Sequence, residues 1–149
     1  MPLNLIARHT RSATPARATV FIGILSGMLF PAVASASPRL RCQLTQGDMV
    51  QVVDVTPVQN PYAATAVDLK GNFRFKAVVI GDEQKIDYIK LYTYYQSKRQ
   101  AVLLHEANYL APVAHPAQSP AALTGMNYLY SPDLGREFKY ACALLEVKP

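Results

Sequence analysis

The sequence lacks most of the residues on which catalytic and metal sites depend. The 149-residue chain contains no tryptophan, two cysteines and three histidines. A zinc site needs several Cys, His, Asp or Glu residues at ligand spacing, and a thiol redox site needs a Cys-x-x-Cys pair or a resolving cysteine. The sequence has neither pattern, no Gly-x-Ser-x-Gly nucleophile elbow and no glycine-rich phosphate loop. These absences favour a non-catalytic protein with no metal and no cofactor.

The chain also lacks a hydrophobic run long enough to span a membrane. Its first eighteen residues contain three arginines and no acidic residue, and the apolar run 20–30 follows. A spanning helix needs about 20 apolar residues, but Pro31 ends this run. A basic segment, a short apolar run and small residues up to Ala36 are the order of a secretory signal peptide. We predict a signal peptide over 1–36, a single β domain over 37–149 and no membrane span after cleavage.

An excess of one charge is missing as well. The chain has 15 basic and 10 acidic residues, and its net charge of +5 falls to +2 once the three arginines of the leader are removed. The remaining basic residues are scattered along the chain. Phosphate backbones bind surfaces on which positive charge is concentrated. Nucleic acid is therefore not an expected partner.

The two cysteines lie near opposite ends of the predicted mature chain. An exported protein meets an oxidising compartment, where Cys42 and Cys142 should form a disulfide. Closing a loop of about 100 residues would stabilise the fold by about 4–5 kcal/mol on chain-entropy arguments. The chain has no Asn-x-Ser/Thr acceptor for N-glycosylation. We expect a periplasmic or secreted protein, and the missing acceptor favours a bacterial one.

From Met49 onward the sequence consists of short runs rich in Val, Ile, Tyr, Phe and Thr, separated by Gly, Pro, Asp and Asn, without a long segment of helical period. This pattern predicts an all-β fold, a small antiparallel β-sandwich whose terminal strands are linked by the disulfide. A closed β-barrel is the alternative. The predicted strands are Arg41–Leu44, Val50–Thr56, Ala63–Leu69, Phe73–Ile80, Ile86–Tyr95, Val102–Tyr109, Asn127–Tyr130 and Glu137–Val147.

The turn at residues 70–72 tests the register of two predicted strands. A three-residue loop places Leu69 opposite Phe73 and Val67 opposite Phe75, so that one apolar face closes. A two-residue loop would mix apolar and basic side chains on both faces. We therefore predict the three-residue loop, as the first turn of a four-strand meander.

Two features of the C-terminal half complete the fold prediction. The Pro/Ala-rich segment 111–122 has neither strand nor helix pattern and should carry the chain from one sheet to the other. In the last predicted strand, alternation puts one set of residues on the core face. These residues are Phe138, Tyr140, Cys142 and Leu144.

Tyrosine is the least ordinary feature of the composition, with nine residues in the chain. Four of them crowd the predicted strand Ile86–Tyr95, where alternation separates the side chains into two faces. The core face is predicted to hold Ile89, Leu91, Thr93 and Tyr95. The opposite face is predicted to hold Ile86, Tyr88, Lys90, Tyr92 and Tyr94.

The exposed tyrosines have a structural and a functional interpretation. Aromatic residues pair well across strands, so Tyr88, Tyr92 and Tyr94 could be packing residues. Alternatively, together with Lys90 they form a recognition patch, since tyrosine offers broad contact area and a hydroxyl at low entropic cost. The functional hypothesis is an exported, non-catalytic accessory module that binds another envelope or extracellular protein.

A binder of glycans or small ligands, or a cell-wall enzyme, is the alternative function. For an enzyme, the group to test is Asp87, His105 and Glu106. Paired carboxylates among Asp54, Asp68, Asp87 and Glu106, which could meet in space, stay a further alternative. However, His105 and Glu106 are neighbours on a strand and point to opposite faces. We expect His105 to be a strand residue that packs against a tyrosine.

Overall fold

The computed structural model describes residues 36–115 and 119–147. The predicted signal peptide lies outside these residues except for Ala36, and it remains a prediction. Within the described ranges no helix is long and apolar enough to cross a membrane.

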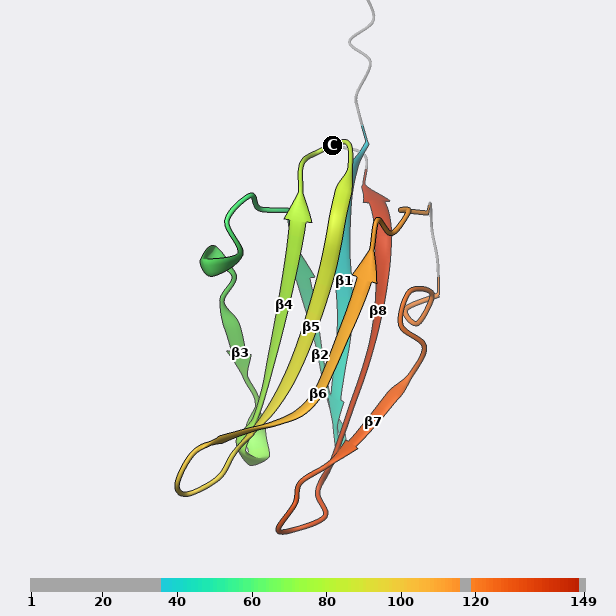
Figure 1. The fold of residues 1–149 in the computed structure, drawn as a ribbon. Helices are drawn as coiled ribbons and strands as arrows, with labels where there is room; N and C mark the ends of the chain where they lie inside the picture. Colours follow the sequence, from blue (N-terminus) through green and yellow to red (C-terminus); the bar gives the residue numbers. More distant parts are fainter. Residues whose placement is uncertain (1–35, 116–118, 148–149) are drawn as a thin grey trace, which may run out of the picture. The chain divides into compact units, whose positions relative to one another are not determined.

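Eight strands form two four-stranded antiparallel sheets that stack as a sandwich (Figure 1). Sheet A has the strand order β2-β1-β8-β7, and sheet B has the order β3-β4-β5-β6. The predicted sandwich is confirmed, and the closed barrel is wrong because neither sheet joins its edge strands to the other. The strands are β1 (Ser37–Gln46), β2 (Met49–Val55), β3 (Ala66–Asp68), β4 (Phe73–Gly81), β5 (Ile86–Gln96), β6 (Ala101–Leu110), β7 (Asn127–Tyr130) and β8 (Glu137–Val147).

Two of the predicted strands have wrong bounds. β1 is longer than predicted because it pairs on both sides, with β2 and with β8. β3 is shorter, because Asn60 and Pro61 start a 3-10 turn, η1 (Pro61–Ala63). The Asn60 side chain accepts a hydrogen bond of 2.9 Å from the Tyr62 N–H, which fixes this turn where a strand was predicted to begin.

The predicted register at the first turn of the meander is confirmed. Val67 pairs with Phe75, and the Leu69 N–H donates to the Phe73 carbonyl at 2.8 Å. The intervening residues form a second 3-10 turn, η2 (Lys70–Asn72), in which Gly71 has φ +68°. The four strands β3 to β6 therefore form sheet B in chain order.

The core lies between the two inner faces and is dominated by aromatic contacts between the sheets. Phe138 of β8 stacks on Phe73 of β4 with ring centroids 5.4 Å apart, and Phe75 lies 5.2 Å from Tyr140. All four predicted core residues of β8 are buried, at 3% exposure or less. β6 lies in sheet B and β7 in sheet A, so the chain crosses between the sheets after Leu110, as predicted.

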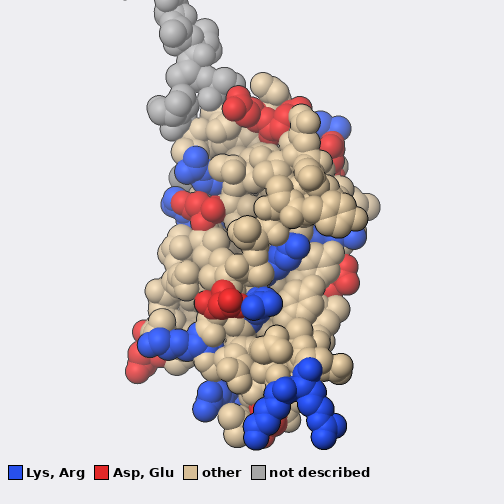
Figure 2. All heavy atoms as spheres, turned by 90° about the vertical axis from the view of Figure 1, so that its left-hand side faces the viewer, with Lys and Arg blue, Asp and Glu red and all other residues tan. Residues whose placement is uncertain are grey.

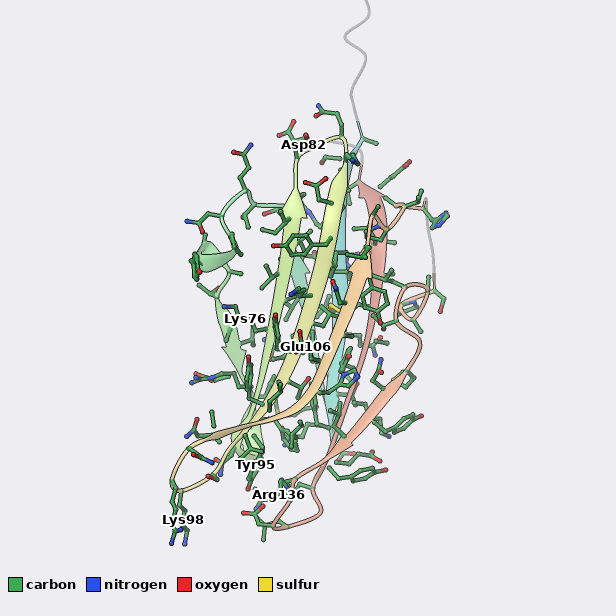
Figure 3. The ribbon with its side chains drawn as sticks, in the orientation of Figure 1. Lys76, Asp82, Tyr95, Lys98, Glu106 and Arg136 are labelled. Carbon is green, nitrogen blue, oxygen red and sulfur yellow. A yellow bond between two sulfur atoms is a disulfide. The ribbon has the colours of Figure 1, made fainter. Side chains whose placement is uncertain are left out.

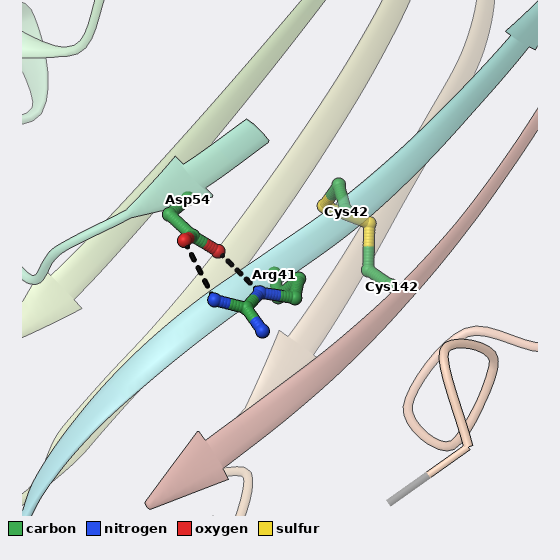
Figure 4. A network of polar contacts seen from close by, with 4 residues as sticks. All are labelled: Arg41, Cys42, Asp54 and Cys142. Carbon is green, nitrogen blue, oxygen red and sulfur yellow. Dashed lines mark hydrogen bonds and ion pairs between the residues drawn. A yellow bond between two sulfur atoms is a disulfide. The ribbon is translucent and has the colours of Figure 1, made fainter. Parts of the chain in front are cut away.

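The disulfide joins two neighbouring strands of the same sheet. Cys42 of β1 and Cys142 of β8 are direct register partners, and both are fully buried (Figure 4). Their separation in sequence is 100 residues, so the bond closes nearly the whole domain. The predicted disulfide is confirmed. A structural disulfide of this kind suggests an oxidising compartment outside the cytoplasm.

Candidate functional site

The predicted tyrosine patch lies on the outer face of sheet B. Tyr88, Lys90, Tyr92 and Tyr94 of β5 are all half-buried, whereas every predicted core residue of the same strand is at 2% exposure or less. We call the outer set, with its cross-strand neighbours, the tyrosine face. The core residues are Ile89, Leu91, Thr93 and Tyr95.

One residue was assigned to the wrong face. Ile86 was predicted beside the tyrosines, but it is 3% exposed and belongs to the core. The cause is a β-bulge between Ile80 and Gly81. Ile80 pairs with Tyr88 and Gly81 pairs with Ile86, so Asp87 has no register partner on β4. Gly81 has φ +154°, and a Cβ there would collide with the carbonyl oxygen of Lys85. The bulge therefore depends on glycine at this position.

Strand pairing places charged residues on both sides of the tyrosines. Tyr92 of β5 has Lys76 of β4 as its partner on one side and Glu106 of β6 on the other. Both charged residues are labelled on the face of sheet B shown in Figure 3. Lys90 lies in the next row, between Val78 and Asn108. The tyrosine face thus presents aromatic rings, two ammonium groups and a carboxylate within three strands.

The chain before β3 adds a fourth tyrosine to this face. Val58 forms a parallel bridge with Ile80, so the segment runs along the edge of β4 beyond the short strand β3. The η1 turn follows and contacts β4. Its Tyr62 is 92% exposed, and Val78 on β4 is only 5% exposed although it points away from the core. Tyr62 and Val78 line the same surface as the β5 tyrosines, so the turn extends the tyrosine face beyond the edge of β4.

These elements surround a shallow hollow of about 360 Å³. Its floor and rim come from η1, β4 and β5. The lining residues are Pro61, Tyr62, Lys76, Val78, Tyr88, Lys90, Tyr92 and Tyr94.

The rings and charges of the tyrosine face interact with each other. Tyr92 and Tyr94 stack with centroids 6.1 Å apart and an interplanar angle of 19°, and the Lys90 ammonium lies 6.0 Å from the Tyr88 centroid. Burial raises the pKa of Tyr94, and the charges of Tyr92 and Glu106 raise it further. The Tyr94 hydroxyl is therefore neutral at physiological pH and can donate a hydrogen bond.

The polar groups of this face have no partners within the described part of the chain. Lys76, Lys90 and Glu106 form no ion pair there, whereas Arg74 at the margin is paired with Asp68. The hydroxyls of Tyr88, Tyr92 and Tyr94, the three β5 tyrosines on this face, make no hydrogen bond to a described residue. Figure 2 shows basic and acidic side chains interspersed on the adjoining side of the molecule. The site therefore offers local contacts rather than a field of one sign.

No family model, no curated protein and no solved structure matches this chain.

The three residues suggested for acid–base chemistry, Asp87, His105 and Glu106, are not brought together. His105 faces the interior, where its Nδ1 lies 2.8 Å from the Tyr140 hydroxyl, while Glu106 is on the outer face. Asp87 sits at the bulge and its carboxylate is 3.6 Å from Lys85. The three residues therefore do not converge on one site: strand alternation separates His105 from Glu106, and Asp87 lies at the bulge. The prediction that His105 packs against a tyrosine is confirmed.

Metal chemistry finds no support among the described residues. Within 36–115 and 119–147, no three His, Cys, Asp or Glu side chains are close enough together to hold an ion.

A second pair of exposed tyrosines lies on the outer face of sheet A. Tyr128 and Tyr130 of β7 are 58% and 55% exposed. Here more of the polar groups are paired: the Tyr130 hydroxyl donates to Glu137 at 3.0 Å, and the Lys139 ammonium lies 2.8 Å from the same carboxylate. This pair resembles the tyrosine face in composition but offers fewer unused groups to a partner.

The sequence reasoning missed Tyr62 and Val78 as members of the site. The position of Lys76 beside Tyr92 could have been obtained by extending the strand register from the turn at 70–72. Nothing in the sequence pattern could have placed Tyr62, because its position depends on the tertiary contact between η1 and β4.

Proposed function

We propose that this chain is an exported, non-catalytic module that binds an envelope or extracellular protein through the tyrosine face of sheet B. The observation that carries the proposal is the hollow between η1, β4 and β5, in which four tyrosines adjoin unpaired Lys76 and Lys90.

The residue types of this face support a protein partner. Tyrosine is enriched among the residues that dominate binding energy at interfaces, especially where surrounding contacts exclude water. Lys76 and Glu106 flank Tyr92 on opposite sides, so a partner would need complementary charges in a fixed order. Charge order of this kind contributes specificity more than affinity.

The shape of the site also favours binding over catalysis. The hollow is shallow, and no acid–base pair converges on it. Its Tyr94 hydroxyl and the two ammonium groups are donors that orient a bound surface. The disulfide supports a compartment outside the cytoplasm, and we propose that this compartment is the periplasm or the exterior of a bacterium.

A glycan is the second candidate ligand, and one observation favours it. The nearly parallel rings of Tyr92 and Tyr94 form a platform on which the C–H face of a sugar ring can pack. Lys76, Glu106 and Asn108 lie in the adjoining rows and could bond its hydroxyls. Such a ligand needs the same tyrosines, so one pair of variants tests both candidates.

The test compares two double variants of the mature, oxidised protein. Tyr92→Ala with Tyr94→Ala removes the stacked pair, and Tyr128→Ala with Tyr130→Ala is the matched control on sheet A. Each immobilised protein is exposed to the native envelope fraction and, separately, to a glycan array. We expect saturable binding of a protein by the wild type and the control, and its loss in the first variant.

Other results would have definite meanings. Tyrosine-dependent binding on the glycan array alone would replace the protein partner by a glycan. Binding that survives in the Tyr92/Tyr94 variant would contradict the assignment to this face. Circular dichroism checks that both variants keep the fold.

A further inference from the structure

The edge strand β2 has an unpaired side over its whole length. β2 pairs only with β1, and no other strand of the described chain lies beside it. Its seven residues, Met49–Val55, are joined to β1 by the two-residue turn Gly47–Asp48. Gly47 has φ +55°, as the first position of a type II′ turn requires.

The turn determines which backbone groups face outward. In a two-residue hairpin the flanking pair, here Gln46 and Met49, is hydrogen-bonded, and bonding then alternates along the strand. The N–H and C=O groups of Val50, Val52 and Asp54 therefore point to the unpaired side. Val50 and Val52 are also 57% exposed each. This edge combines unused backbone groups with exposed apolar side chains.

The other edges of the sandwich are protected in ways that β2 is not. β3 and β7 have three and four residues, and β6 carries a bulge where Thr93 and Tyr94 meet it. Short strands and bulges oppose edge-to-edge pairing, as do lysine and proline. β2 has no lysine, no proline and no break in register.

The charges of this strand favour a second copy of the same chain as the occupant. The carboxylate of Asp54 is held by Arg41 of β1 at 2.7 and 2.9 Å (Figure 4). The one charge on β2 is thus neutralised within its own molecule, and two identical edges do not repel each other. Val50 and Val52 lie on the same face, so a two-fold axis brings the valines of both copies together.

We infer that β2 is the interface of a homodimer in which the β2 strands of two copies pair antiparallel and join their A sheets into one eight-stranded sheet. The paired strands span about 23 Å at 3.3 Å per residue. One pair of seven-residue strands is a small contact of the weak, transient class, and we expect the dimer to form at micromolar rather than nanomolar concentration.

The dimer has a consequence for binding that rests on the proposed function. The two-fold axis between antiparallel strands is perpendicular to the sheet, so both B sheets lie on the same side of the joined A sheets. The two tyrosine faces then point in one direction. A partner with repeated epitopes would bind both, and avidity would compensate for a weak single contact.

Sedimentation velocity of the mature, oxidised protein tests the interface directly. From about 1 μM to about 500 μM the wild type should pass from monomer to dimer. Val52→Lys places a charge on the edge and should weaken dimerisation at least about tenfold. Leu134→Lys is the matched control, because Leu134 is 60% exposed and lies in the β7–β8 hairpin, outside the unpaired edge of β2.

The outcomes separate this inference from the proposed function. A wild type that stays monomeric throughout, or a Val52→Lys variant that dimerises like the wild type, overturns the inference. The Tyr92/Tyr94 alanine variant should still dimerise, whatever its effect on ligand binding. If Val52→Lys fails to fold by circular dichroism, Val50→Lys takes its place.

Discussion

The two sheets of this sandwich are assembled from different parts of the chain. Sheet B contains four strands in chain order, joined by short turns, whereas sheet A joins β1 and β2 from the start of the domain to β7 and β8 from its end. Pairing in sheet B is specified by local turns, whereas sheet A consists of two hairpins joined by the pairing of β1 with β8, which requires closure of almost the whole domain. The disulfide lies in sheet A, where closing this long loop costs conformational entropy.

The outer faces of the two sheets differ as well. On sheet A, Arg41 is paired with Asp54, and Glu137 accepts hydrogen bonds from Tyr130 and Lys139. On sheet B, the lysines, the carboxylate and the tyrosine hydroxyls of the central rows are unpaired within the described chain. Sheet A closes the fold, and the outer face of sheet B carries polar groups that have no partner in the described chain.

The largest expected effect comes from removing the bond that closes sheet A. Replacing Cys42 and Cys142 by alanine should lower the free energy of unfolding by about 4–5 kcal/mol, because a loop of about 100 residues is no longer closed in the unfolded chain. Equilibrium urea denaturation measures the loss. Hydrogen exchange should show a greater loss of protection in β1 and β8 than in β4 and β5. An equal loss in all four strands would mean that the sheets unfold as one unit.

A smaller effect is expected from the polar contact between the sheets. Tyr140→Phe keeps the buried ring but leaves His105 Nδ1 without its partner, at a cost of about 1–2 kcal/mol. Burial raises the pKa of the Tyr140 phenol, so the neutral form stabilises the fold, and this contribution is lost as pH rises above the ordinary value of about 10. As pH rises above about 10, the free energy of unfolding of the Tyr140→Phe variant should therefore fall less than that of the wild type.

The matched control for this variant is Tyr109→Phe, since the Tyr109 hydroxyl has no hydrogen-bond partner among the described residues. Urea denaturation at neutral and alkaline pH measures both variants. Equal losses in the two would show that the Tyr140–His105 bond contributes nothing specific.

The smallest expected effect has the opposite sign and concerns the inner face of sheet B. The Thr93 hydroxyl is buried and has no hydrogen-bond partner in the described structure. Thr93→Val should therefore raise the free energy of unfolding by about 1 kcal/mol. Thr45→Val on the half-buried outer face of sheet A should change stability by less than about 0.5 kcal/mol. A destabilised Thr93→Val variant would reveal a partner for this hydroxyl.

Much of sheet B could be predicted because its determinants are local. The opposition of Leu69 and Phe73 followed from the length of one turn, and the two faces of β5 followed from alternation. The prediction failed at Ile86, where Gly81 permits a bulge that moves one residue across the sheet. Alternation of side chains along a strand does not indicate where a bulge inserts an extra residue.

The sequence by itself determined the all-β class, the pairing of the two cysteines and the set of tyrosines that share a face, because composition, cysteine number and strand alternation are properties of the chain. Only the tertiary structure decided the order of strands in sheet A, the addition of Tyr62 to the tyrosine face and the separation of His105 from Glu106 and Asp87. These three features depend on contacts between residues far apart in the chain. The energies of such contacts are set by tertiary packing, which cannot be read from a local sequence pattern.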